Sequence, residues 1–131
     1  MKNDMKILCL TEEEEQMLLF RWAELHSGKR PELRLLFHIP NGGKRSKVEA
    51  ARFKAAGVKA GVPDLFLPVP CGEHHGLFVE LKRRKGGRVS EEQGAWLIEL
   101  AKQGYRVEVC KGWEEARTVI EKYLDKEGET K

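Results

Sequence analysis

The sequence predicts an α/β domain, with a small mixed β-sheet and helices packed on its faces. Helical and strand-like segments follow one another in the order α, β, α, β, β, α, β, α, which is typical of this class. The chain has 131 residues, of which 40% are hydrophobic, enough for one modest core. We therefore expect a single domain over residues 1–131, with its core at about 11–124 and a charged tail at 125–131.

The first helix is marked by its N-terminal signals. Thr11 has the character of an N-cap, and Thr11 with Glu14 matches the capping-box pattern. The acidic run Glu12–Glu15 fills the first turn, where carboxylates complement the helix dipole. The helix is expected to end near Ser27 and Gly28.

A strand and a short helix are expected next. Leu33–Ile39 has strand-like composition and is followed by Pro40, which ends such segments. Lys47–Ala56 has a partly apolar helical pattern, and Gly57 is suited to a C-cap.

Two strands then form an expected β-hairpin. Asp64–Val69 is short and apolar, the segment 70–76 is rich in turn residues, and Leu77–Lys82 pairs back as the second strand.

The last three elements are a helix, a strand and a helix. Ser90 caps the first helix, with Gln93 at its third position, and Gly104 stops it. Tyr105–Cys110 alternates as a strand, and Trp113–Leu124 has the pattern of a final helix. The buried stripe of the first of these helices is expected to comprise Trp96, Leu97, Leu100 and Ala101.

Composition excludes several classes of protein. No apolar run approaches the ~20 residues of a transmembrane helix, and the apolar stretch before the four glutamates is too short for a signal peptide. Three cysteines without a Cys-x-x-Cys spacing argue against a disulfide framework. We therefore expect a cytoplasmic protein without membrane association.

The basic residues are more informative in their distribution than in the net charge of +3. They gather around Lys44–Lys47, between Arg52 and Lys59, and in Lys82–Lys85. These runs flank the hairpin and favour a track for phosphate groups.

The hairpin carries a group of charged residues suited to phosphate chemistry. Residues two apart on a strand lie on one face, so Glu80 and Lys82 share a face, about 6.6 Å apart. Asp64 follows Pro63 at the entrance of the other strand. If the strands are antiparallel neighbours, Asp64 and Glu80 converge. Two carboxylates with a backbone carbonyl suit Mg²⁺ or Mn²⁺, beside which Lys82 can stabilise developing negative charge.

This arrangement resembles the PD-(D/E)XK nuclease superfamily. Five blocks in order resemble its VRR-NUC family over roughly residues 11 to 117. They are Asn41-Gly42-Gly43, Gly57-Val58-Lys59-Ala60-Gly61-Val62-Pro63-Asp64-Leu65, Glu80-Leu81-Lys82, Ser90-Glu91-Glu92-Gln93 and Gly104-Tyr105-Arg106-Val107. The resemblance implies a restriction-endonuclease-like core of helix, three strands, helix and strand.

The resemblance also implies roles for individual residues. Asp64, Glu80 and the Leu81 carbonyl would bind the metal, and Lys82 would be the catalytic lysine. Gln93 matches a glutamine near the site, although it also fits as the capping partner of Ser90.

The family further carries a glutamate on the first helix, four residues before a glutamine. Gln16 places this residue at Glu12. Glu13 and Glu15 remain alternatives within the acidic run, and a purely helix-stabilising role for Glu12 also remains open.

The expected partner is DNA, and the expected oligomer is a homodimer. Stand-alone members of the family are typically phage or bacterial and resemble Holliday-junction resolvases, so branched DNA in a bacterial cell or phage-infected host is the expectation. The candidate DNA contacts are Asn41, Gly42, Gly43, Lys44, Arg45, Lys47, Lys59 and Arg83.

The main hypothesis is therefore a divalent-metal-dependent DNA endonuclease. The alternative is a basic nucleic-acid-binding module without catalysis, in which the hairpin charges only stabilise the fold. An RNA-processing nuclease is disfavoured, because such enzymes rely on a histidine and neither His38 nor the loop histidines are suitably placed in the sequence.

Overall fold

A four-stranded mixed sheet lies at the centre of the computed structural model, which describes residues 9–40 and 46–125. The strands are β1 (Phe37–His38), β2 (Leu65–Leu67), β3 (Leu77–Lys82) and β4 (Arg106–Lys111), in the spatial order β1-β2-β3-β4. The pairs β1–β2 and β2–β3 are antiparallel. β3 and β4 are parallel, because the chain crosses over through a helix between them.

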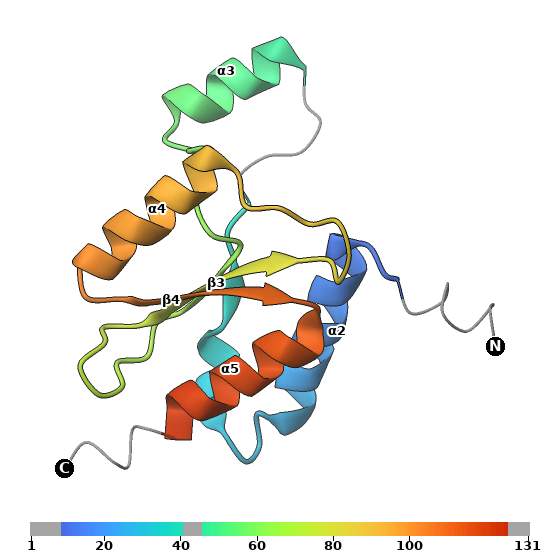
Figure 1. Ribbon diagram of the computed structural model, residues 1–131, viewed down its shortest axis with the longest axis vertical. Coiled ribbons are helices and arrows are strands. Elements are labelled where there is room, and N and C mark those ends of the chain that lie inside the picture. Colours follow the sequence, from blue (N-terminus) through green and yellow to red (C-terminus); the bar gives the residue numbers. More distant parts are fainter. Residues whose placement is uncertain (1–8, 41–45, 126–131) are drawn as a thin grey trace.

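Helices cover both faces of this sheet. The helices of the described residues are α2 (Glu12–His26), the 3₁₀ helix η1 (Pro31–Leu35), α3 (Lys47–Ala55), α4 (Glu91–Lys102) and α5 (Trp113–Asp125). Figure 1 shows α4 on one side of the sheet and α2 with α5 on the other. The expected α/β class, and the core order of helix, three strands, helix and strand, are confirmed.

The main core lies between the sheet and the pair of helices α2 and α5. Leu77, Val79 and Leu81 of β3 point into it and are at most 1% exposed. They meet Leu19 of α2 and Ile120 of α5, which are fully buried. Burial of each such side chain stabilises the fold by roughly 1.5–3 kcal/mol, so β3 is firmly held from this side.

The predicted strand at Leu33–Ile39 is wrong over most of its length. Residues 31–35 form η1, and only Phe37 and His38 belong to β1. Leu33 and Leu36, three residues apart, are both buried. A 3₁₀ turn places residues three apart on one side, so it buries both leucines where an extended strand would not.

The stripe predicted on α4 is only half-buried. Trp96, Leu97 and Leu100 are partly exposed, and Ala101 is exposed. The reason is that α4 packs chiefly on β4, at the edge of the sheet. The prediction of a fully buried face on this helix is therefore wrong.

α3 stands away from the sheet (Figure 1). Its predicted bounds are nearly right, and Ser46 with Glu49 forms a capping box at its start. No residue of α3 is buried, and the side chain of Val48 is 70% exposed. Within the described part of the chain, no helix is long and apolar enough to cross a bilayer.

Candidate active site

Glu80 and Lys82 lie on the face of β3 that is directed towards α4. Their neighbours Val79 and Leu81 point into the main core, so the alternation of the strand separates the two sets. Glu80 is 1% exposed and Lys82 is 6% exposed. The predicted shared face is confirmed, and both charged groups are far more buried than ordinary surface residues.

Asp64 lies beside Glu80 because of the hairpin register. Leu65 pairs with Val79, which sets Asp64 opposite Glu80 across the antiparallel strands. Asp64 Oδ2 accepts a hydrogen bond of 2.9 Å from the backbone N–H of Leu81. The carbonyl oxygen of Asp64 accepts a 2.7 Å bond from the N–H of Ile39. The aspartate is thus fixed at both its backbone and its carboxylate.

The glycine-rich approach to Asp64 is packed against the start of α4. Gly61 has φ +91°, and a Cβ added there would lie 2.9 Å from the backbone of Glu92. Only glycine tolerates both the backbone conformation and this close approach. Pro63, which follows, is buried. The loop therefore aligns Asp64 with the first turn of α4.

Gln93 connects the site to α4 through a single side-chain amide. Its Oε1 accepts bonds of 2.9 Å from Lys82 Nζ and from the backbone N–H of Ser90. Its Nε2 donates a 2.9 Å bond to Glu80 Oε2, and that same oxygen lies 3.3 Å from Lys82 Nζ. The capping role and the position beside the carboxylate and lysine, both considered from the sequence, occur together.

Burial dominates the electrostatics of the two carboxylates. It raises the pKa of Glu80 to about 7, reinforced by the nearby negative charge of Asp64, while Lys82 opposes the rise. The pKa of Asp64 is also raised by burial, and the hydrogen bond from Leu81 opposes this rise. Two crowded carboxylates of this kind favour binding a cation.

The donor groups fit a hard divalent metal ion. Glu80 Oε1 is buried and has no hydrogen-bond partner among the described residues, although buried polar atoms are nearly always paired. The N–H and C=O of one strand residue point to the same side, so the Leu81 carbonyl is directed to the side of Asp64. Oxygen donors of this type are the ligands that Mg²⁺ and Mn²⁺ prefer.

The described part of the chain brings no third carboxylate to Asp64 and Glu80. Among residues 9–40 and 46–125, no group of three or more His, Cys, Asp or Glu side chains is close enough to hold a metal. Glu12 and Glu13 are exposed on the first turn of α2. The metal-binding role of Glu12 therefore remains a prediction.

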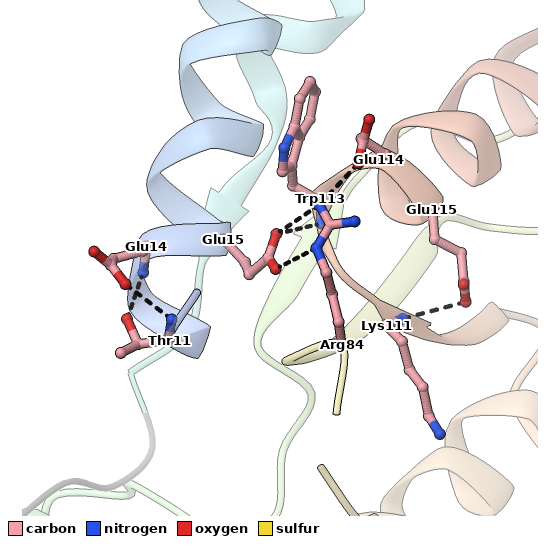
Figure 2. A network of polar contacts seen from close by, with 8 residues as sticks. All are labelled: Thr11, Glu14, Glu15, Arg84, Lys111, Trp113, Glu114 and Glu115. Atoms are coloured by element: carbon pink, nitrogen blue, oxygen red, sulfur yellow. Dashed lines mark hydrogen bonds and ion pairs between the residues drawn. The ribbon is translucent and has the colours of Figure 1, made fainter. Parts of the chain in front are cut away.

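Glu15, the other alternative, is buried and engaged elsewhere. Figure 2 shows its carboxylate facing Arg84 and the start of α5. The sequence contains a signal for this burial, because Glu15 precedes the buried Leu19 by four residues on the stripe that continues with Trp22 and Ala23. Because Glu15 lies within the acidic run Glu12–Glu15, this spacing alone did not distinguish it from its exposed neighbours.

Two other findings concern positions named from the sequence. Of the candidate DNA contacts, Asn41 to Arg45 lie outside the described residues, while Lys47, Lys59 and Arg83 are exposed. The sequence position of His38 does not suit a histidine-dependent nuclease, yet its Nδ1 lies 2.9 Å from the carbonyl oxygen of Asp64. Only strand pairing brings the two together, and no local motif announces it.

Comparison with protein families matches the VRR-NUC domain over residues 10–114. The chain belongs to the VRR-NUC family. A solved structure described as a VRR_NUC domain protein is 36% identical, with a TM-score of 0.78 over 89% of this chain and 90% of that one. A comparison with curated proteins finds no match. The VRR-NUC domain is a nuclease domain, so Asp64, Glu80 and Lys82 lie in a nuclease fold.

Proposed function

We propose that this VRR-NUC protein is a divalent-metal-dependent endonuclease that hydrolyses phosphodiester bonds of DNA. The observation that carries the proposal is the buried, unpaired Oε1 of Glu80 beside the carboxylate of Asp64. Such an arrangement is costly unless a proton or a metal ion neutralises it. Lys82, held beside these carboxylates, supplies a positive charge that can stabilise the phosphate.

Asp64, Glu80 and the Leu81 carbonyl are the groups that would hold Mg²⁺ or Mn²⁺. When bound, the metal supplies Lewis-acid polarisation of the scissile phosphate and favours ionisation of the attacking water. The contacts of Asp64 with Leu81 and Ile39 keep its carboxylate in place beside Glu80. The protein thus provides a preformed pair of carboxylates for the ion.

Lys82 would act on the phosphate itself. Its ammonium group is anchored by Gln93 at 2.9 Å and by Glu80 at 3.3 Å, which leaves one of its three donors for a substrate oxygen. A cation fixed in a buried site stabilises the charge that develops on the phosphate more effectively than a mobile surface lysine. Gln93 holds both partners in this geometry.

The substrate we propose is branched DNA, cut by a homodimer. Lys47, Lys59 and Arg83 lie on α3, on the loop before β2 and directly after β3, and all three are exposed for contact with the phosphate backbone. Two copies of the site would allow paired cuts in two strands. Cleavage patterns on four-way, flap and linear duplex DNA, with light scattering for the oligomer, test these points separately.

The decisive experiment compares the wild-type protein with Asp64→Asn and Lys82→Ala on a DNA junction with Mg²⁺ or Mn²⁺. We expect cleavage by the wild type only, loss of at least about a hundredfold in each variant, and retained DNA binding by Lys82→Ala. Binding by the wild type without cleavage under either metal would favour the non-catalytic module instead.

A further inference from the structure

A polar network on the far side of β3 from the carboxylates joins three elements at one buried group. Glu15 of α2 is 0% exposed. Its Oε2 accepts a 2.9 Å bond from Arg84 Nε, and its Oε1 accepts a 3.0 Å bond from the backbone N–H of Trp113. Figure 2 shows these contacts converging from α2, from the segment after β3 and from the start of α5.

The contacts of Glu15 favour a role outside the metal site. Both of its carboxylate oxygens are already bonded, in contrast to the unpaired Oε1 of Glu80. Its helix stripe continues into Leu19, which packs in the main core with Leu81, whereas Glu80 points to the opposite face of β3. Glu15 has both carboxylate oxygens hydrogen-bonded and lies on the opposite side of β3 from Glu80, so we assign it a structural role.

Arg84 links the contacts of Glu15 to the backbone of Lys82. Its guanidinium also bonds Glu114 of α5, at 2.8 Å. Its side chain lies against Gly112, where an added Cβ would be 3.2 Å from three of its atoms. The N–H of Gly112 in turn donates a 2.9 Å bond to the carbonyl oxygen of Lys82. Arg84 therefore secures the turn that holds the backbone of Lys82.

This backbone needs such support, because Lys82 is the last residue of β3. Beyond it the chain leaves the sheet, and Arg83 is exposed. A lysine side chain has four rotatable bonds, so the placement of its ammonium depends on a fixed main chain. The bidentate fork of arginine supplies a more rigid tie than a single charge.

We propose that Glu15 and Arg84 form a positioning pair that fixes the end of β3 and thereby the ammonium group of Lys82. The inference rests on the proposed nuclease function and assigns Glu15 to positioning, not to metal binding. The proposal assigns neither residue a contact with DNA or metal. The pair acts through the Gly112 turn on the placement of Lys82 beside Glu80 and Gln93.

The test uses Arg84→Lys and Glu15→Gln in the full chain. The matched control is Arg106→Lys, because Arg106 also forms a partly exposed ion pair, with Glu108 at 2.6 Å. We expect kcat to fall by about 10- to 100-fold in both test variants, with KM and the calorimetric Kd for Mn²⁺ within about threefold of wild type. The double variant should lose no more than the worse single variant.

Two outcomes would overturn the proposal. A tenfold weaker Mn²⁺ affinity in Glu15→Gln would make Glu15 a metal ligand. An unchanged kcat in both variants would mean that the pair does not position Lys82.

A second measurement does not depend on cleavage. Backbone hydrogen exchange at Gly112 should accelerate at least tenfold in Arg84→Lys, while exchange at Leu65 and Leu67 of β2 stays as in wild type. Hydrogen exchange can be measured even if the wild type cuts no DNA. Absence of cleavage would refute the proposed function but not the positioning pair. Unchanged exchange at Gly112 would refute the positioning pair.

Discussion

At the scale of single residues, Gln93 shows how one amide serves both a helix and a site. Two donors, the N–H of Ser90 and the ammonium of Lys82, meet at its Oε1. This sets the orientation of the amide, so that its NH₂ group must face Glu80. The side-chain amide of Gln93 therefore both caps α4 and aligns Lys82 with Glu80.

Replacement of Gln93 should separate these two contributions. Gln93→Ala removes the side-chain half of the capping box and the bonds to Lys82 and Glu80, so we expect a stability loss of about 1 kcal/mol and a large fall in kcat. Ser90→Ala is the matched control, because it removes a capping bond but leaves Gln93 beside Lys82. Thermal unfolding and steady-state kinetics measure both effects. Equal losses of kcat in the two variants would contradict this assignment.

The raised pKa of Glu80 predicts how stability of the metal-free protein depends on pH. Its value of about 7 lies above the ordinary 4.5, so between these values the folded protein holds a proton that the unfolded chain has released. Stability must therefore fall as pH rises from about 4.5 to about 7. Glu80→Gln should remove most of this fall in Tm measured with a chelator present. An identical pH slope in the variant would be inconsistent with the burial effect.

Much of the site was predictable at this scale, for identifiable reasons. The shared face of Glu80 and Lys82 follows from strand geometry alone, and the convergence of Asp64 with Glu80 follows once the two strands pair antiparallel. Contacts between segments that are distant in the sequence cannot be predicted in this way. The bond between Glu15 and Arg84 joins residues 69 positions apart, and no periodicity in one segment specifies its partner in another.

At the scale of elements, the contact between the Gly61 loop and α4 aligns the two halves of the site. The loop leads directly to Asp64, and α4 carries Gln93. The 2.9 Å approach of an added Cβ to the Glu92 backbone shows how closely the two pack. A shift of either element would move a carboxylate relative to the amide.

Gly61→Ala should therefore affect both stability and catalysis. The left-handed backbone of Gly61 alone should cost about 1–3 kcal/mol with alanine, and relief of the clash would displace Asp64 from Gln93. Gly28→Ala is the control, because an added Cβ there meets nothing within 4 Å. Denaturant unfolding and kcat test the pair of variants. A Gly61→Ala protein as stable and active as Gly28→Ala would refute this role.

Element types were predicted well where caps or hairpin turns marked them, as at Thr11, Ser46 and Ser90. They were predicted poorly where tertiary packing decided the conformation. Leu33–Ile39 has the composition of a strand, but burial of both Leu33 and Leu36 favours a 3₁₀ turn. The half-exposed face of α4 likewise depends on where the helix sits on the sheet.

At the scale of the whole molecule, metal binding should be coupled to folding. An ion that binds only the folded state raises its stability according to its concentration and affinity. Below a pH of about 7, Glu80 carries a proton that the ion must displace. The proposed site thus makes the stabilisation dependent on pH.

We expect Mn²⁺ to raise Tm more at pH 8 than at pH 5.5. Differential scanning fluorimetry of the wild type over a Mn²⁺ titration measures this difference. Asp64→Asn, which keeps an acceptor for the Leu81 N–H, is the control and should lose most of the shift. A shift of equal size in wild type and Asp64→Asn would place the ion elsewhere.

The exposed helix α3 is an expected site of proteolytic cleavage, which would divide the chain into two fragments. The helix buries none of its residues and contains Arg52 and Lys54, both exposed. Among the described residues, trypsin should therefore cut there first, since local opening costs little free energy in a segment without buried residues. Asp64, Glu80, Lys82 and Gln93 would all remain in the C-terminal fragment.

Glu15, however, would be carried by the N-terminal fragment with the rest of α2. The two fragments should stay associated through the main core, where Leu19 packs with residues of β3 and α5. The nicked protein would then be a complementing pair of peptides, in which one fragment supplies Asp64, Glu80, Lys82 and Gln93. The other would supply α2, with Glu15 and Glu12.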